Sequence, residues 1–329
     1  MTLPRFDAAA VPASELVCAL GEIGAVLVHD ASLPAARCDR ALADVAAFFA
    51  LPAADKQALA IAGSPHFRGY SEMHNERDWR EQMHFGRELA PVPGDAAHWR
   101  LQGPNRWPAD AAWRARMLDW LAGVEAVGAR LLAAVASRFG LDAADWLGDS
   151  PYGLMKAIGY HAQAASHARR PGVAAHVDFS LVTLTLQDEV GGLEVQRPSG
   201  EWLAVPPVRG ALLLHVGELL AFVTGGRLVA TPHRVVNPSL ARSRFSIPVF
   251  VNPSLATRLA RALPPVPVAP RPGAHVHAVL DEPAAVAASA LHFGAAEWRR
   301  KGENVWCTAC RRGDAGTDRI PATRARVSG

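Results

Sequence analysis

Cysteine is scarce in this chain of 329 residues, which carries four of them. So few cysteines over such a length do not form the disulfide framework that stabilises small secreted proteins. Two of them make a single C-x-x-C, from Cys307 to Cys310. We interpret that pair as structural, because it lacks both the second pair of a zinc site and the βαβ context of a thioredoxin-like motif.

An excess of charge of one sign is absent as well. The chain has 34 basic and 31 acidic residues, which gives a net charge of +3. This balance favours neither nucleic acid nor an anionic membrane as a partner. Basic residues do gather between positions 299 and 326, where we interpret them as a solvated terminus.

Long apolar runs are missing too. No uninterrupted stretch reaches the roughly 18–20 residues that a membrane-spanning helix needs, and the best candidate, residues 203–223, contains prolines and charged residues. The first dozen residues lack the basic segment and apolar core of a secretory leader. We therefore expect a soluble protein of the cytoplasm.

The period of the apolar residues changes near position 150. Before it, residues 37–51 and 108–139 carry apolar side chains at i, i+3 or i+4, and i+7, which predicts two amphipathic helices. Between them, residues 63–105 are polar and aromatic, which favours a loop. We expect residues 1–150 to form a mostly helical region packed on a barrel.

From residue 151 onwards, short apolar runs alternate with glycine and proline turn signals, which is typical of a sandwich or barrel. We place this β-rich core at residues 151–262. The last region, 263–329, begins with a segment of five prolines and is expected to contain an extended connector, a helix near residues 283–301 and a tail. The three regions should form one structural unit.

One spacing has a direct chemical meaning. His176 and Asp178 lie two residues apart at the start of a segment rich in Val, Leu and Thr, and His233 ends a later apolar run. Side chains at i and i+2 of a strand point to the same side, so the first two would enter one cavity. Two imidazoles and a carboxylate are the ligands of non-haem iron sites, which keep positions open for oxygen and an organic ligand.

A second pair follows His233. Arg244 and Ser246 are again two residues apart in a strand-like segment and would face the same interior. Arginine is permanently charged and offers a planar fork of donors to a carboxylate, and serine adds a neutral hydroxyl. A lone His-x-Asp is more often a surface feature, but its combination with the later histidine and the Arg-x-Ser pair favours a metal site.

Over nearly its whole length the chain resembles the isopenicillin N synthase-like branch of the non-haem iron(II), 2-oxoglutarate-dependent oxygenases. The segments that carry the resemblance are AFFALPAADKQALA, FRGYSEMHNERDWREQMHFGRE, GPNRWP, HVDFSLVTLTLQDEVGGLEV, FVTGGRLVATPHRVV and RFSIPVFVNP. The resemblance implies an α+β fold, a distorted double-stranded β-helix or jelly roll with a mostly helical N-terminal region and a long backing helix.

The resemblance also implies iron(II), 2-oxoglutarate and O2 as cofactor and cosubstrates, with ascorbate expected to support activity. The enzyme would hydroxylate, desaturate or cyclise a small-molecule substrate and release succinate and CO2. Six residues match the family's positions for iron (His176, Asp178 and His233) and for the far carboxylate of 2-oxoglutarate (Arg244, Ser246 and Tyr160).

Two positions depart from the family's usual pattern. The sequence Gly159-Tyr160-His161 stands where two tyrosines and a proline are common, and His215 stands where asparagine is frequent. We interpret His161 and His215 as packed or hydrogen-bonded histidines. In this family the barrel mouth is usually covered by the N-terminal loop region and the C-terminal helix. The candidates for contact with the primary substrate are Arg80, Phe85, Phe179 and Trp298.

Other functions stay open at this point. An oxidase of the isopenicillin N synthase type uses the same fold without 2-oxoglutarate, and its Arg-x-Ser pair would hold a substrate carboxylate. The segments FVTGGRLVATPHRVV and LHFG also look like bacterial ethylene-forming members, although such framework segments assign no product. A non-catalytic jelly-roll module would not need both half-sites, and a zinc hydrolase would gain nothing from Arg244 and Ser246.

Overall fold

A large sheet of eight strands organises the molecule, whose computed structural model describes residues 3–162, 171–236, 241–267 and 291–303. The strand order is β1-β2-β10-β7-β12-β5-β4-β3, and every pairing except β1 with β2 is antiparallel. The strands are β1 (Arg5–Asp7), β2 (Ala25–His29), β3 (Gly69–His74), β4 (Trp79–Gly86), β5 (Leu154–Tyr160), β7 (Val182–Gln187), β10 (Leu212–Val216) and β12 (Arg244–Val251).

A second sheet of four strands, in the order β6-β11-β8-β9, completes the jelly roll, so the expected α+β fold with a double-stranded β-helix is confirmed. Its strands are β6 (Val173–His176), β8 (Leu193–Gln196), β9 (Trp202–Ala204) and β11 (His233–Val235). A short pair, β13 (Arg258–Leu259) with β14 (Leu291–His292), lies beside the last described helix.

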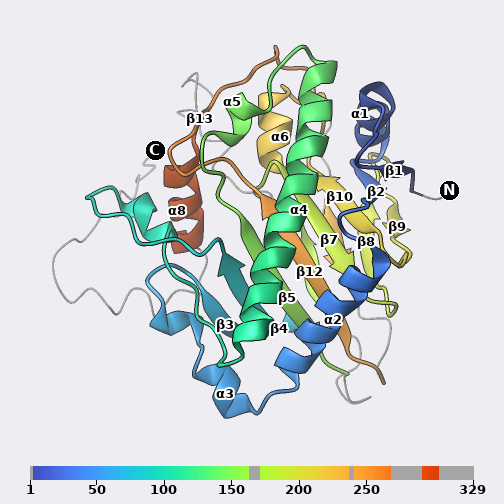
Figure 1. Ribbon diagram of the computed structural model, residues 1–329. Coiled ribbons are helices and arrows are strands. Elements are labelled where there is room, and N and C mark those ends of the chain that lie inside the picture. The colour runs from blue at the N-terminus through green and yellow to red at the C-terminus, as the bar shows by residue number, and fades with distance from the viewer. Residues whose placement is uncertain (1–2, 163–170, 237–240, 268–290, 304–329) are drawn as a thin grey trace, which may run out of the picture.

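Helices cover one face of the large sheet, where α2 (Ala35–Phe49) and α4 (Ala111–Arg138) both cross β12 (Figure 1). Both helices were predicted from their apolar stripes. The Asp110 side chain caps α4 by accepting hydrogen bonds from the backbone N–H of Ala112 and Trp113, both at 2.9 Å. The other described helices are α1 (Ala13–Glu22), α3 (Ala53–Gln57), α5 (Ala144–Leu147), α6 (Glu218–Val223), α8 (Phe293–Glu303) and two 3-10 turns, Ile61–Gly63 and Ala97–Leu101.

The backing helix α4 is long and apolar because it lies in the core. Of the helices in the described part of the chain, it alone has the length and composition to cross a membrane, and half of its most apolar window is buried. Its buried side chains, among them Trp113, Trp120 and Leu131, belong to the larger hydrophobic core. A smaller core, which includes Ile158 and Val195, lies on the opposite face of the large sheet.

Four strands of the large sheet come from the region before residue 150, where the apolar pattern indicates helices and a loop. The hairpin of β3 and β4 occupies much of the predicted loop, and β4 pairs directly with β5, so the sheet crosses the boundary at 150. The loop prediction missed this hairpin because of its high polar content: Arg80, Gln82 and His84 lie on one face of β4 and line an internal cavity. The opposite face carries Met83 and Phe85 in the core, but Glu81, which pairs with Lys56, interrupts its apolar pattern.

The C-terminal helix α8 begins later than predicted. It starts at Phe293, directly after β14, and ends at Glu303. The remaining predictions for this region, namely residues 283–290, most of the proline-rich connector, the Cys307–Cys310 pair and the basic tail, lie outside the described residues.

The close approach of α4 to the sheet supplies a test of the packing. A Cβ added at Gly128 would lie 2.6 Å from Val251 Cγ2 of β12 and 3.1 Å from Leu184 Cδ1 of β7. We expect Gly128→Ala to lower the free energy of unfolding, because overpacking costs about 1–3 kcal/mol and exceeds the ~1 kcal/mol gain in helix propensity. Denaturant unfolding measures the difference.

The matched control is Gly21→Ala in α1, where an added Cβ meets no atom within 4 Å. The same chemical change should there raise stability by about 0.5–1 kcal/mol, since only the propensity term remains. A stabilising Gly128→Ala would show that α4 is not packed as closely as described.

Candidate active site

A cavity of about 800 Å³ is bounded by both sheets and by α8. Alternate residues of β4, β5 and β12 form the wall that belongs to the large sheet, and β6 and β11 contribute residues opposite. From α8, one helical face of Glu297, Arg300 and Lys301 reaches the cavity. The polar face of the large sheet is thus turned inward, where it can contact a small molecule.

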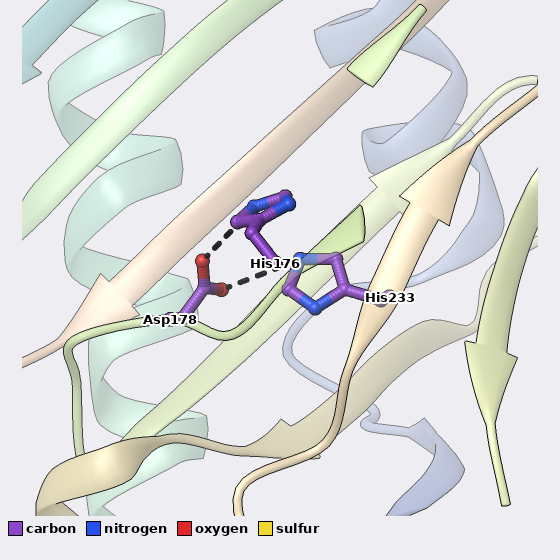
Figure 2. A group of neighbouring side chains, drawn as sticks. All are labelled: His176, Asp178 and His233. Carbon is purple, nitrogen blue, oxygen red and sulfur yellow. Dashed lines mark ion pairs between the residues drawn. The ribbon is translucent and has the colours of Figure 1, made fainter. Parts of the chain in front are cut away.

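The predicted triad meets at one end of this cavity. His176 ends β6 and His233 begins β11, and the two residues are register partners whose ring centroids lie 4.2 Å apart. Asp178 points toward both rings (Figure 2). One ligand atom from each of the three side chains lies within 4.8 Å of the other two. The expectation of one strand through His176 and Asp178 is corrected, because β6 ends at His176 and β7 starts only at Val182.

The charge states of the triad suit a divalent metal. Burial alone would raise the pKa of Asp178, but His233 and the other neighbouring imidazoles hold that pKa well below its ordinary value, so the carboxylate is ionised. Burial lowers the pKa of His233 well below its ordinary value, so its ring is neutral. An anionic carboxylate with neutral imidazoles is the protonation state in which these groups bind metals.

Hydrogen bonds also orient the two imidazoles. Nδ1 of His176 lies 2.9 Å from the Ala174 carbonyl oxygen, and Nδ1 of His233 lies 3.1 Å from that of Thr231. A carbonyl only accepts, so each Nδ1 donates a proton to it and each Nε2 is the ring nitrogen left to bind a metal. Both Nε2 atoms face the Asp178 carboxylate, at 3.5 Å for His176 and 3.8 Å for His233. The donor set therefore fits iron(II).

Two further residues, which do not line the cavity, contact the triad. The Thr183 hydroxyl donates a 2.7 Å hydrogen bond to Asp178 Oδ2. His215, on β10, is buried, and its Nε2 lies 3.6 Å from the same oxygen, with its ring 4.3 Å from that of His233. His215 does not line the cavity. It is a packed histidine, as interpreted, but its neighbours are two of the triad residues.

The predicted carboxylate site is assembled across β5 and β12. Arg244 is the register partner of Tyr160, and its guanidinium lies 4.7 Å from the centre of the tyrosine ring. Its Nη1 donates to Ser246 Oγ at 3.1 Å, its Nη2 to Gln187 Oε1 at 3.2 Å, and its Nε to the Gly191 carbonyl. Arginine has five N–H donors, so two remain beyond these contacts with described residues.

Two of the four substrate candidates line the cavity and two do not. Arg80 and Phe179 are part of its wall. Phe85 is odd-numbered on β4, so it points to the opposite face from Arg80 and stacks on Trp107 in the core, 4.9 Å between centroids. Trp298 lies off the cavity face of α8 and packs edge-on against Phe67 at 5.7 Å. The structure therefore corrects the placement of Phe85 and Trp298.

His161 belongs to a structural network instead of the cavity. Its Nε2 lies 3.0 Å from Glu81 Oε1, and the Lys56 ammonium lies 2.6 Å from Glu81 Oε2. Burial alone would raise the pKa of Glu81, but the hydrogen bonds from His161 and Lys56 bring it down to about 2. The histidine in place of the family's proline thus ties the end of β5 to β4 and α3.

Sequence reasoning missed several polar residues of the cavity wall, which include Gln82, His84, Lys156 and Asn252. A signal existed for Lys156, the only charged residue of the strand LMKAIGY. It lies four positions before Tyr160, so the alternation of a strand puts both on one face. No comparable signal marked Gln82 and His84, because the strand that carries them was not expected.

Comparisons with known proteins agree with this geometry. Residues 153–253 match the family model of the 2OG-Fe(II) oxygenase superfamily, and residues 3–110 match the N-terminal model of the non-haem dioxygenases in morphine synthesis. A 2-oxoglutarate-dependent dioxygenase of Gibberella zeae is 32% identical over 271 residues, which cover 74% of this chain and 71% of the relative. The chain belongs to the 2-oxoglutarate and iron(II)-dependent oxygenase superfamily.

A second relative, the 2-oxoglutarate-dependent dioxygenase frbJ of a Dothideomycetidae species, is 31% identical over 242 residues, and the match spans slightly less than two thirds of its length, 66%. Among solved structures, a 2OG-Fe(II) oxygenase family protein of Caulobacter crescentus has a TM-score of 0.71 with 25% identity, over 92% of this chain and 98% of that one. A Neurospora crassa protein in complex with alpha-KG and thymine also has a TM-score of 0.71 and shares the fold at 20% identity, over 91% and 96% of the two chains.

The Thr183 contact generates a prediction about metal affinity. Thr183→Val keeps the shape of the side chain and removes the hydroxyl that orients the Asp178 carboxylate. Loss of such an outer hydrogen bond typically lowers metal affinity by about 10- to 100-fold. Competition with a chelator for iron(II) under anaerobic conditions measures the change, and Thr183→Ser, which keeps the hydroxyl, serves as the control. Equal iron affinity in all three proteins would show that the contact has no such role.

Proposed function

We propose that the protein is an iron(II)- and 2-oxoglutarate-dependent oxygenase that oxidises a small organic substrate and releases succinate and CO2. The observation that carries this proposal is the presence, in one cavity, of the His176, Asp178 and His233 cluster and of the buried Arg244. A 2-oxo acid with a second carboxylate could bind a metal through its 2-oxo acid end and Arg244 through its far carboxylate.

The residues would divide the work as follows. His176, Asp178 and His233 would hold the iron, which when bound supplies the activation of O2 coupled to oxidation of 2-oxoglutarate. Arg244 and Ser246 would hold the far carboxylate, the arginine with charge and the serine with a neutral hydroxyl donor. The ring of Tyr160 packs against the Arg244 guanidinium and helps to hold it in place. Arg244 is fully buried, so its charge acts on a carboxylate without competition from bulk water.

An oxidase that needs no 2-oxoglutarate is the second candidate, because Arg244 and Ser246 could hold a substrate carboxylate instead. The names of the relatives favour the 2-oxoglutarate-dependent reaction. Oxygen consumption measured with and without 2-oxoglutarate separates the two candidates. Hydroxylation, desaturation, cyclisation and ethylene formation would then be distinguished by product analysis.

The triad assignment is tested by single alanine substitutions. We expect His176→Ala, Asp178→Ala and His233→Ala each to abolish succinate formation and to lower the iron content, with circular dichroism unchanged. The control is His74→Ala, an exposed histidine outside the cavity lining, which should keep activity and iron. Near-normal iron content and turnover in any one triad variant would remove that residue from the assignment.

The carboxylate assignment is tested by the requirement for 2-oxoglutarate. Arg244→Ala leaves a buried carboxylate without its partner, which costs about 2–5 kcal/mol, so 2-oxoglutarate affinity should fall by at least about 30-fold. Ser246→Ala removes one neutral hydrogen bond, worth on the order of 1 kcal/mol, and should cost about fivefold. Unchanged 2-oxoglutarate affinity in Arg244→Ala would favour the oxidase candidate.

A further inference from the structure

One lysine in the cavity has no hydrogen-bond or ion-pair partner among the described residues. The chain contains three lysines, and two of them are paired, Lys56 with Glu81 at 2.6 Å and Lys301 with Glu297 at 3.3 Å. Lys156 lines the cavity, and it makes no hydrogen bond or ion pair with any residue that the structure describes. Its Nζ lies 5.1 Å from the centre of the Phe250 ring. Lys156 is half-buried in the cavity wall, so its side chain is open to a ligand that enters the cavity.

The position of Lys156 separates it from the Arg244 site. Lys156 and Tyr160 lie on the same face of β5, four residues apart. At about 3.3 Å per residue, their Cα atoms are ~13 Å apart along the strand. Tyr160 is the register partner of Arg244, so the lysine and the arginine stand at different ends of the sheet wall. A second anion could therefore bind near Lys156 while 2-oxoglutarate occupies the arginine.

Neutral side chains with polar atoms that lack hydrogen-bond partners among the described residues line the same cavity as the lysine. His84 is the register partner of Lys156 on β4, is buried, and neither ring nitrogen has a hydrogen-bond partner among the described residues. Burial lowers the pKa of His84 well below its ordinary value, so the ring is neutral. In the same described set, Gln82 Oε1 and Asn252 Oδ1 also lack partners, and both side chains line the cavity. Buried polar atoms left unsatisfied in a cavity wall indicate a polar ligand.

The local charge is positive. Arg300 and Lys301 reach the same cavity from α8 and both pair with Glu297, and Arg80 on β4 pairs with Asp78 at 3.5 Å. Burial and the nearby cations of Arg80 and Lys301 lower the pKa of Lys156 to about 7. An anion bound beside Lys156 would relieve this repulsion and return the ammonium to its charged form.

We infer that the primary substrate is a small organic anion whose carboxylate binds Lys156, while His84, Gln82 and Asn252 contact its polar substituents. The apolar parts of the same wall, Met73, Ile158 and Phe250 among them, would cover its carbon skeleton. This inference rests on the proposed function for the word substrate, but the anion site itself does not depend on turnover. A phosphate monoester would meet the same lysine, and the test below separates it from a carboxylate.

The first experiment observes Lys156 directly. Reductive methylation with [13C]formaldehyde labels three lysines and the terminal amine, and Lys156→Arg identifies the Lys156 signal. With zinc in place of iron and 2-oxoglutarate bound, the protein is titrated with a panel of aliphatic and aromatic carboxylates, their primary amides and the matching phosphate monoesters. We expect at least one carboxylate to shift the Lys156 signal and raise its pKa, and its amide to have no effect.

Two results of this titration would overturn the inference, and a third would separate it from the proposed function. A panel in which no carboxylate moves the Lys156 signal overturns the inference, and so does a signal that only the phosphate monoesters move. If a carboxylate binds at Lys156 but the iron-loaded protein forms no succinate, the anion site stands and the proposed function fails.

The second experiment uses Lys156→Met, which keeps the length of the side chain and removes its charge. We expect the carboxylate found above to bind about 10- to 100-fold more weakly, as for loss of a hydrogen bond to a charged group, with no preference left over its amide. Lys156→Met should leave the thermal unfolding midpoint and the 2-oxoglutarate affinity unchanged. Arg244→Met should instead weaken the binding of 2-oxoglutarate and keep the affinity for the carboxylate. A Lys156→Met protein that loses 2-oxoglutarate affinity and keeps carboxylate affinity would place Lys156 in the 2-oxoglutarate site and contradict the inference.

Discussion

Alternation across the pleat of the large sheet is the constraint on which the rest of the structure depends. One face of β4, β5 and β12 is apolar and packs against α2 and α4, and the other is polar and lines the cavity. Because the period of a strand is two, a shift of one residue in register would exchange the two faces. The tight contact of Gly128 with β7 and β12 on one side, and the row of Tyr160 and Arg244 on the other, are consequences of the same register.

Charge then divides the cavity. Asp178 is ionised beside the neutral His233 at one end of the wall, and Arg244 and Lys156 stand at two other positions along the large sheet. Arg244 is fully buried, and three hydrogen bonds within the protein offset part of the cost of burying its charge and orient its guanidinium. Lys156 lacks such contacts among the described residues, and we infer that a bound carboxylate supplies its counter-charge. Two anchors of this kind would orient two different molecules around one metal.

Much of the site could be predicted because its polar residues occur as pairs two residues apart, His-x-Asp and Arg-x-Ser, whose residue types indicate metal and carboxylate binding. His176, Asp178, His233, Arg244 and Ser246 come together in one cavity, as their order and residue types indicate. The strand assumed for Asp178 ends before it, so Asp178 reaches the shared cavity from an irregular segment and not through the i, i+2 rule. The β3–β4 hairpin was missed because Glu81 interrupts the apolar face of β4 with a charge that pairs with Lys56. Phe85 was misplaced because alternation was not applied to a strand that was not expected. Lys156 was overlooked because it is a single charge in an apolar strand. Its spacing of four residues from Tyr160 nevertheless places both side chains on the same face of β5.

The most direct test of the account is an anaerobic titration of the iron(II)-loaded protein with 2-oxoglutarate, followed by visible absorption. Chelation of the metal by the 2-oxo acid should produce a charge-transfer band that requires both components and saturates at one equivalent per chain. The account predicts the band in the wild type, its absence in Asp178→Ala, and a much higher 2-oxoglutarate midpoint in Arg244→Ala. A wild-type protein that binds iron and shows no band at saturating 2-oxoglutarate would contradict the claim that the two half-sites serve one cosubstrate.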